Sequence, residues 1–152
     1  MPKIQTNTKT FEDVLDAVKN KGLRVTAPNK GDSFEIGRAK CEVMTDSILN
    51  KDNLNLSSIV IRLEFENNSF LFMGDAETAN EKTRTWMKTD VLKVGHHGSN
   101  TSSSEDFLKQ INPTYAVIMA GKNNSYGLPK QKILDRLTKI GAKVYRTDEE
   151  GT

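Results

Sequence analysis

The clearest pattern in the chain is an alternation of apolar with smaller or polar positions over residues 58–66. Alternation of this kind has the period of a strand that buries one face. The apolar positions are Ile59, Ile61, Leu63 and Phe65. Asn67-Asn68 follows as a turn, and the apolar run 70–73 is the expected return strand. The segment therefore predicts a β-hairpin.

The N-terminal part of the chain predicts an amphipathic helix. Thr10 followed by Glu12 and Asp13 is typical of a capped helix start, and Gly22 is a typical end. The apolar stripe of this helix consists of Phe11, Val14, Leu15 and Val18. Since these positions recur with helical spacing, the helix is expected to present one apolar face to a neighbour.

Three short strands and a loop are expected between this helix and the hairpin. The run 23–27 is predicted to be a strand that Pro28 closes. Residues 32–45 predict two further strands, hinged near Gly37. The segment 46–57 is polar and rich in asparagine, and it is predicted to be a loop.

Strands and helices alternate in the second half of the chain. The expected strands are 91–94, 115–119 and 143–146. The expected helices are 76–88, a helix capped by Ser103 and stopped by Pro113, and a helix opened by Pro129 and closed by Gly141. The apolar positions of the last two helices are Phe107, Leu108, Ile111, Ile133, Leu134, Leu137 and Ile140. This alternation predicts an α/β arrangement of layers.

Composition narrows the class of protein. The 152 residues are 36% hydrophobic and 28% charged, which predicts one globular domain over residues 1–152. The net charge of +2 gives no basic face that would by itself indicate nucleic acid. Cys41 is the single cysteine, which excludes an internal disulfide and a cysteine-rich zinc site.

Membrane and secretion signals are also lacking in the sequence. No run approaches the roughly 18 apolar residues that span a bilayer, and the first residues lack a signal-peptide core. The chain as given is therefore expected to be soluble. A longer parent protein can still be membrane-attached, secreted or cytoplasmic.

The two histidines of the chain are adjacent, at His96 and His97, in a loop that follows a predicted strand. Histidine is the commonest metal ligand and the usual acid or base near neutral pH. Two further loops that follow predicted strands carry Asp75 and Asn124. Because sites in open α/β sheets gather at the carboxyl ends of strands, these side chains are expected to meet. Carboxylate and imidazole ligands suit zinc, manganese or iron.

Each of these residues also has a purely structural interpretation. Asp75 can cap a following helix, and Gly98-Ser99 and Asn123-Asn124 can serve only as turns. A Ser99–His97–Asp75 hydrolase is a further alternative, although Ser99 lies only two residues beyond His97 on the same loop. The phosphate-loop, dinucleotide-binding and nucleophile-elbow motifs do not occur in the sequence.

Taken together, these loops resemble the metallo-β-lactamase superfamily, and more narrowly the ComEC-type competence metallo-hydrolases linked to bacterial DNA uptake. The residues that carry the resemblance are Ser57-Ser58-Ile59-Val60, Phe70-Leu71-Phe72-Met73-Gly74-Asp75-Ala76-Glu77, Asp90-Val91-Leu92-Lys93-Val94-Gly95-His96-His97-Gly98-Ser99, Tyr115-Ala116-Val117-Ile118, Asn124-Ser125-Tyr126-Gly127 and Tyr145-Arg146-Thr147-Asp148-Glu149. They extend over nearly the whole chain.

The resemblance implies an αββα sandwich of two ββα halves, with one or two divalent metals at the edge of the sheets. Zinc or manganese is the implied metal, and hydrolysis of a phosphodiester in DNA is the implied chemistry. Asp75 and His96 are the predicted metal ligands, and His97 and His96 the predicted catalytic residues. Which histidine meets the metal and which meets the substrate stays open. Ser99 and Asn124 are the predicted substrate contacts.

Two departures from the family pattern limit what this chain is expected to do. The family's His-x-His-x-Asp-His motif is absent, and Leu128 stands where the family usually has the histidine of Tyr-Gly-His-Pro. We therefore expect the C-terminal half of the sandwich, a mixed sheet with helices on one face, whose partner is the missing N-terminal half. A catalytic zinc site wants about three protein ligands, so the isolated chain is expected to hold little or no metal and to lack hydrolysis.

A half-sandwich also predicts an exposed apolar sheet face. Such faces mark interfaces or aggregation, so self-association is expected unless the sheet is covered in some other way. A competing hypothesis is a non-catalytic binding or structural module that keeps the loops for nucleic-acid or partner contact, with a degenerate metal site.

Overall fold

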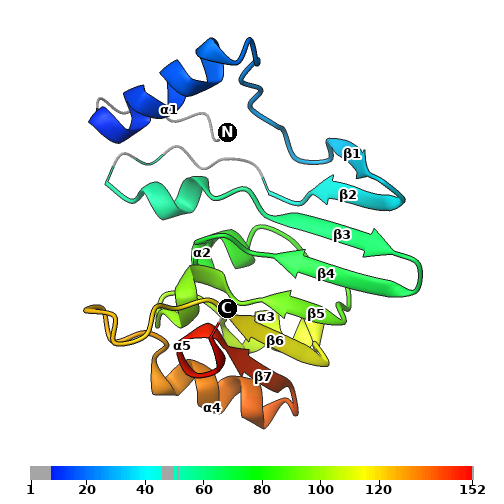
Figure 1. Cartoon of the computed structure of the whole chain (residues 1–152). Helices are drawn as coiled ribbons and strands as arrows, with labels where there is room; N and C mark the ends of the chain where they lie inside the picture. The colour runs from blue at the N-terminus through cyan, green and yellow to red at the C-terminus, as the bar shows by residue number, and fades with distance from the viewer. Residues whose placement is uncertain (1–7, 46–49, 51, 152) are drawn as a thin grey trace.

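A single seven-stranded sheet organises the computed structural model, which describes residues 8–45, 50 and 52–151 (Figure 1). The strands are β1 (Ser33–Ile36), β2 (Ala39–Val43), β3 (Ile61–Phe65), β4 (Asn68–Phe72), β5 (Val91–Lys93), β6 (Tyr115–Ile118) and β7 (Lys143–Arg146). The helices are α1 (Lys9–Asn20), α2 (Thr78–Glu81), α3 (Glu105–Ile111), α4 (Gln131–Lys139) and α5 (Thr147–Glu150), with 3-10 turns η1 (Leu54–Ser57) and η2 (Gly95–Gly98). The strands lie in the sheet in their order along the chain.

The sheet is mixed. Strands β1 to β4 pair antiparallel, and β4 to β7 pair parallel. The hairpin of β3 and β4 pairs Ile61 with Phe72 and Phe65 with Asn68, as the alternation in this segment predicts. The connections between the parallel strands contain α2, α3 and α4 in turn, because parallel neighbours need a crossover. The prediction of an α/β fold with a mixed sheet is confirmed.

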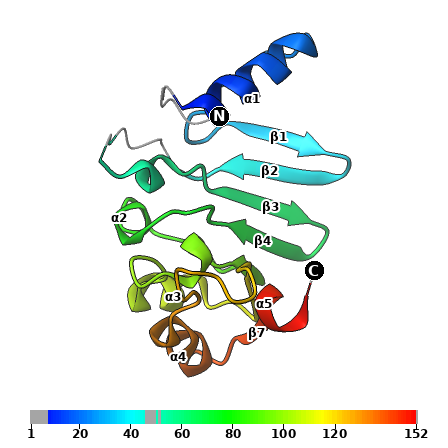
Figure 2. The same ribbon diagram turned by 60° about the vertical axis from the view of Figure 1, so that its left-hand side comes forward.

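One face of the parallel half of the sheet holds the core. Helices α3 and α4 pack together on this face, and Figure 2 shows them next to each other at the end of the molecule that carries β7. The buried side chains of the two helices are Phe107, Leu108, Ile111, Ile133 and Leu137, and those of the strands are Leu71, Leu92, Ala116 and Ile118. Each large apolar side chain buried in this way contributes about 1.5–3 kcal/mol.

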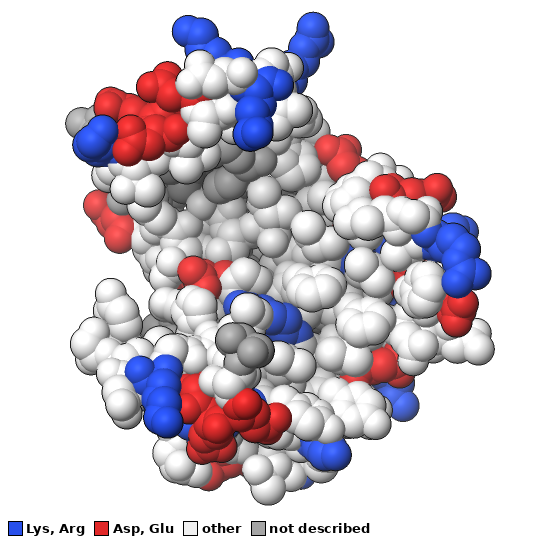
Figure 3. All heavy atoms as spheres, in the orientation of Figure 1, with Lys and Arg blue, Asp and Glu red and all other residues white. Residues whose placement is uncertain are grey.

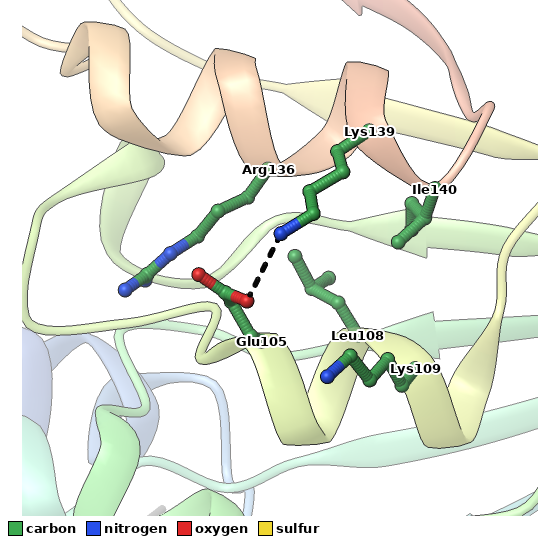
Figure 4. Close-up of a pocket in the computed structure, with 6 residues that line it drawn as sticks. All are labelled: Glu105, Leu108, Lys109, Arg136, Lys139 and Ile140. Atoms are coloured by element: carbon green, nitrogen blue, oxygen red, sulfur yellow. Dashed lines mark ion pairs between the residues drawn. The ribbon is translucent and has the colours of Figure 1, made fainter.

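A hollow of about 250 Å³ separates the outer surfaces of α3 and α4 (Figure 4). Leu108 and Ile140 are among the residues that line it, and an ion pair between Glu105 and Lys139 crosses it with a distance of 3.5 Å between Oε2 and Nζ. Both charged side chains are about half or more exposed, so this pair contributes little to stability.

The opposite face of the sheet is apolar and only partly covered. Register places every second side chain of each of the seven strands on this face. Its most exposed apolar members are Ile36 at 62%, Phe34 at 43%, Phe72 at 42% and Tyr115 at 42%. Figure 3 shows a largely uncharged, hollowed surface over the middle strands. We call this side of the sheet the apolar sheet face. No helix among the described residues covers it in the way that α3 and α4 cover the opposite side.

Helix α1 matches the predicted helix, with a different cap. The Thr8 hydroxyl accepts a hydrogen bond from the Phe11 backbone N–H, so the helix begins two residues before the predicted start at Thr10. None of its residues is buried, so its apolar stripe adds little to the core. Among the described residues, no helix combines the length and the hydropathy that crossing a membrane requires.

Two of the predicted elements are wrong in type or extent. Residues 23–27 are irregular and not a strand, and Leu23 and Val25 are 61% and 48% exposed, because a short apolar alternation forms a strand only where a neighbour can pair with it. The predicted helix 76–88 is reduced to α2. Its last carbonyls accept hydrogen bonds from the Thr83 hydroxyl and the Trp86 indole, and these contacts end the helix after one turn.

Helix caps account for the other corrections. Ser104, not Ser103, caps α3, and its hydroxyl accepts the Phe107 N–H. Helix α4 has Lys130 as its N-cap residue, so Pro129 precedes the helix and does not open it. The predicted loop 46–57 includes η1, while its residues 46–49 and 51 lie outside the described residues. The chain ends in α5, which the sequence pattern did not predict.

Glu81 connects α2 to the segment before α3. Its side chain is 3% exposed, and its carboxylate accepts the backbone N–H groups of Ser103 and Ser104 at 2.5 and 2.9 Å. Its carbonyl accepts the indole N–H of Trp86 at 2.6 Å. Buried polar groups need partners, and Glu81 supplies three. Glu81 therefore helps to join the segments that follow β4 and β5.

Replacing Asp90 with asparagine is expected to lower the free energy of unfolding at pH 7 by about 1.5–3 kcal/mol, the usual worth of hydrogen bonds to a charged group. The Asp90 carboxylate accepts the hydroxyl and the backbone N–H of Ser69 at 2.6 and 2.7 Å, and these contacts join the starts of β4 and β5. Hydrogen bonds from Ser69, aided by the charge of Arg62, hold the pKa of Asp90 below its ordinary value of 3.8 despite the opposing effect of burial.

A lowered pKa in the folded state stabilises the fold above the unfolded pKa, and that stabilisation is lost as the pH falls through the folded value. Urea unfolding at pH 7 and pH 3 should therefore show a difference between wild type and Asp90→Asn that shrinks in acid. Asp16→Asn, on the exposed side of α1, is the matched control. A difference that is the same at both pH values would contradict this role of the carboxylate.

Candidate active site

The site lies at the carboxyl ends of β4, β5 and β6, where three loops meet. The loops are 74–77 after β4, 94–99 after β5 and 119–128 after β6. The Gly74 carbonyl accepts the backbone N–H of His96 and the Lys93 ammonium, both at 3.0 Å, so the first two loops are joined through their backbones. The parallel arrangement thus brings the predicted residues to one edge of the sheet.

The two histidines adopt the left-handed backbone conformation. His96 has φ 46° and ψ 45°, and His97 has φ 52° and ψ 25°. Consecutive non-glycine residues in this region are strained, and such strain clusters at functional sites. The glycines around them fit the turn: a Cβ at Gly95 would lie 2.8 Å from the Ala76 carbonyl oxygen, and one at Gly98 would lie 2.7 Å from the Cβ of Pro129. The two imidazole rings diverge, with centroids 6.4 Å apart.

His97 turns toward Asp75. Its Nε2 lies 3.3 Å from the Asp75 Oδ1, and both side chains are more than 40% exposed. Its Nδ1 lies 2.5 Å from the Met119 carbonyl oxygen, which can only accept, so Nδ1 carries the proton. A neutral His97 therefore directs the lone pair of Nε2 at the carboxylate. Two such electron-pair donors require a proton or a cation between them.

His96 turns the other way, into a polar network. Its Nδ1 lies 3.2 Å from the Thr101 hydroxyl and 3.4 Å from the Glu77 Oε1, and its Nε2 lies 3.4 Å from the Asn55 amide nitrogen. The amide nitrogen can only donate, so Nε2 accepts and Nδ1 donates. Both ring nitrogens of His96 are therefore engaged by the chain itself.

Glu77 is the centre of this network, and its role had not been predicted. Its carboxylate accepts the Asn53 amide at 2.9 Å, the Asn55 amide at 3.2 Å and the Thr101 hydroxyl at 3.1 Å. Burial raises the pKa of Glu77, but the hydrogen bonds from Asn53, Asn55 and Thr101 outweigh burial and hold the pKa below its ordinary value. The one available signal was the position of Glu77, two residues beyond Asp75 in the same loop.

The structure engages Ser99 and Asn124 in loop contacts. The Ser99 hydroxyl lies 3.2 Å from the hydroxyl of Thr101, on the His96 side. The Asn124 amide nitrogen donates to the carbonyls of Gly121 and Leu128 at 2.9 and 2.7 Å, and its oxygen accepts the Leu128 N–H at 3.0 Å. These contacts are the turn chemistry that the structural interpretation anticipates. Their predicted contact with substrate stays a prediction.

The donor atoms of the site determine whether a metal ion fits there. The Nε2 of His97 and the Oδ1 of Asp75 lie 3.3 Å apart, and an imidazole nitrogen and a carboxylate oxygen are both donors that zinc accepts, so these two residues would hold the metal from this chain. Within the described residues, however, no group of three or more His, Cys, Asp and Glu side chains could hold a metal. The described residues fit part of a metal site and do not complete one.

Comparison with known proteins agrees with the fold. A family model described as the metallo-beta-lactamase superfamily matches residues 9–122. The solved structure of a mutant of CmlA beta-hydroxylase has the same fold, with a TM-score of 0.59, 13% sequence identity and coverage of 86% of this chain and 34% of that one.

The chain is also similar to three longer bacterial proteins. ComE operon protein 3 of Bacillus subtilis is 36% identical over 100% of this chain. Recombination protein 2 of Haemophilus influenzae and competence protein ComA of Neisseria gonorrhoeae are 42% and 37% identical, each over 64% of it. The chain spans only 20%, 13% and 15% of the lengths of these relatives. With the match of the family model, these similarities show that the chain belongs to the metallo-β-lactamase superfamily and that it is a member of the ComEC type.

Proposed function

We propose that the chain is part of a metal-dependent hydrolase that cleaves phosphodiester bonds in DNA during DNA uptake. Membership of the metallo-β-lactamase superfamily supports a hydrolase, and the name of a relative, competence protein ComA, supports the link to competence. Zinc or manganese is the proposed metal, because imidazole and carboxylate ligands suit both.

The observation that carries this proposal is the pairing of His97 with Asp75. A hydrogen bond from Nδ1 to a backbone carbonyl is the usual way in which a protein orients a histidine so that Nε2 can bind a metal. The Oδ1 of Asp75 lies 3.3 Å from this Nε2. Asp75 and His97 are thus the proposed ligands from this chain.

His96 receives a positioning role in this proposal. Its two ring nitrogens are held by Asn55, Thr101 and Glu77, and its backbone N–H is held by Gly74. A metal ion could bind a ring nitrogen of His96 only after these contacts had been broken. The earlier assignment of His96 as a metal ligand with Asp75 is therefore replaced, in the proposal, by His97 with Asp75.

The isolated chain is proposed to be inactive, because two ligands fall short of the three that a catalytic zinc site needs. Further ligands would come from polypeptide beyond this chain, as expected for one half of a two-part sandwich. The much greater length of the relatives is consistent with this.

The test measures bound zinc and manganese, and hydrolysis of single-stranded DNA, in this chain and in a longer protein that contains it. We expect weak metal binding and no hydrolysis by the chain alone. In the longer protein, Asp75→Asn and His97→Ala should each lower kcat at least about a hundredfold, since each removes a metal ligand. Thr138→Ala, at an exposed position of α4 away from the three loops, is the control.

Stoichiometric, tight metal in the isolated chain would contradict the incomplete site. Full activity of the longer protein with both Asp75→Asn and His97→Ala would remove the hydrolase proposal. A larger loss of activity from His96→Ala than from His97→Ala would reverse the roles proposed for the two histidines.

A second candidate function is a binding module that has lost catalysis. Leu128, which cannot ligate a metal, lines the surface next to His97 and favours this alternative. A longer protein that binds DNA and holds no metal would support the binding module over the hydrolase.

A further inference from the structure

An apolar hollow lies directly beside the Asp75–His97 pair. It measures about 260 Å³, and its lining includes His97, Met119, Ala120, Asn124, Tyr126 and Leu128. Ligand pockets usually measure about 300–1,000 Å³, so this hollow has room for one ring system and not for a larger molecule. Neither the proposed ligand pair nor its supporting network accounts for it.

Tyr126 forms an exposed wall of this hollow. It is 77% exposed, the highest value among the large hydrophobic side chains in the described part of the chain. At this position the ring leaves apolar surface in contact with water and does not pack in the core. Such a ring is typical of a surface that a ligand covers.

The loop that carries Tyr126 is held rigidly by its own contacts. The Asn124 side chain makes three hydrogen bonds to Gly121 and Leu128, and the Lys130 ammonium donates to the Tyr126 carbonyl at 2.8 Å. The backbone N–H of Gly127 donates to the Asn124 carbonyl. The ring is therefore presented from a fixed backbone, which lowers the entropic cost of binding against it.

The residues that line the hollow favour a ligand with a planar, apolar surface. The amide of Asn124 is already satisfied by the loop, and Met119, Ala120 and Leu128 offer no polar side-chain atoms. No acidic side chain is among the residues that line the hollow. A ring can stack there without base-specific hydrogen bonds, and a phosphate attached to it meets no negative charge in the hollow itself.

We propose that this hollow holds one nucleobase of a single-stranded nucleic acid, stacked on Tyr126, next to the phosphodiester that reaches Asp75 and His97. The inference rests on the proposed function and names the substrate of that site as an unpaired strand, because a base must leave the duplex stack to enter the hollow. Proteins that bind single strands without sequence preference use such aromatic platforms.

The test uses the 152-residue chain without added metal, so that binding is measured apart from hydrolysis. A thymidine tetranucleotide and an abasic tetranucleotide of the same length and charge are each titrated into the ¹⁵N-labelled chain. We expect the thymidine strand to bind about five- to a hundredfold more tightly, with the largest shifts in residues 119–128.

Tyr126→Ala should abolish this difference between the two strands, and Tyr126→Phe should keep it, because the ring and not the hydroxyl makes the contact. Tyr115→Ala, which removes an exposed aromatic ring of the apolar sheet face, is the matched control and should leave the difference unchanged.

Equal binding of the two strands, or no binding of either, would overturn the nucleobase site. The hydrolase proposal would survive that result, since it rests on Asp75 and His97. Conversely, a longer protein that does not hydrolyse DNA, together with Tyr126-dependent binding, would remove the hydrolase and leave the nucleobase site as part of a binding module.

Discussion

Replacing Leu128 with histidine is expected to raise the affinity of the chain for zinc by at least about tenfold. Leu128 lines the hollow next to His97, and its backbone is held on both sides by the Asn124 amide. An imidazole introduced there would join the Asp75–His97 pair as a third ligand, which is the number that a catalytic zinc site uses. Loss of an outer-shell partner alone changes metal affinity by about 10–100-fold, so a new ligand should do at least as much.

Competition with a zinc-binding dye measures this gain. Leu23→His, which places the same imidazole at a position that is 61% exposed, is the matched control and should leave the affinity near that of the wild type. Adding Asp75→Asn to Leu128→His should cancel the gain. If Leu128→His binds zinc no better than the control, Leu128 does not occupy a position for a third ligand.

The second large effect concerns the apolar sheet face. The isolated chain is expected to form dimers or larger species at tens of micromolar, because Phe34, Ile36, Phe72 and Tyr115 leave apolar surface in water on one face. Stable interfaces bury about 1,200–2,000 Å², and a sheet face of seven strands can supply this. When the chain is studied alone, a second copy of the chain is the molecule that can cover this face.

Light scattering after gel filtration measures the mass. The double variant Phe72→Lys, Tyr115→Lys should shift the chain to the monomer, because two lysines in the middle of the interface would be desolvated together. Met87→Lys changes a residue of similar exposure, 49%, outside the strands, and it should keep the wild-type mass. A monodisperse wild-type monomer would contradict self-association through this face.

Sequence patterns predicted the strands better than the helices, for a physical reason. The alternation around Leu63 reports the period of an extended strand whose apolar side chains share one half-buried face, and all seven strands of the sheet had been expected. Residues 23–27 show a similar alternation without becoming a strand, since pairing depends on a neighbour that a local pattern cannot reveal. The helix predicted over 76–88 failed because the side chains of Thr83 and Trp86 bind the carbonyls that would continue it.

The meeting of the loops was predictable from the sequence, and the contacts between their side chains were not. The loops of Asp75 and the histidine pair follow strands, so their meeting at one edge could be expected. Which histidine faces Asp75 depends on the left-handed backbone at His96 and His97, and adjacent residues of the same type carry no signal of that kind. The role of Glu77 depends on hydrogen bonds from Asn53 and Asn55, which lie more than 20 residues away in a segment expected only to be a loop.

The contacts of Glu81 have a consequence for how the protein fluctuates. Its buried carboxylate joins α2, which follows the loop of Asp75, to Ser103 and Ser104, which follow the loop of His97. Neither loop can unfold locally without releasing these hydrogen bonds, so the two should open together as one cooperative unit. Amide hydrogen exchange in residues 76–82 and 95–104 would then proceed at a common opening free energy, and a ligand that protects one loop would slow exchange in the other.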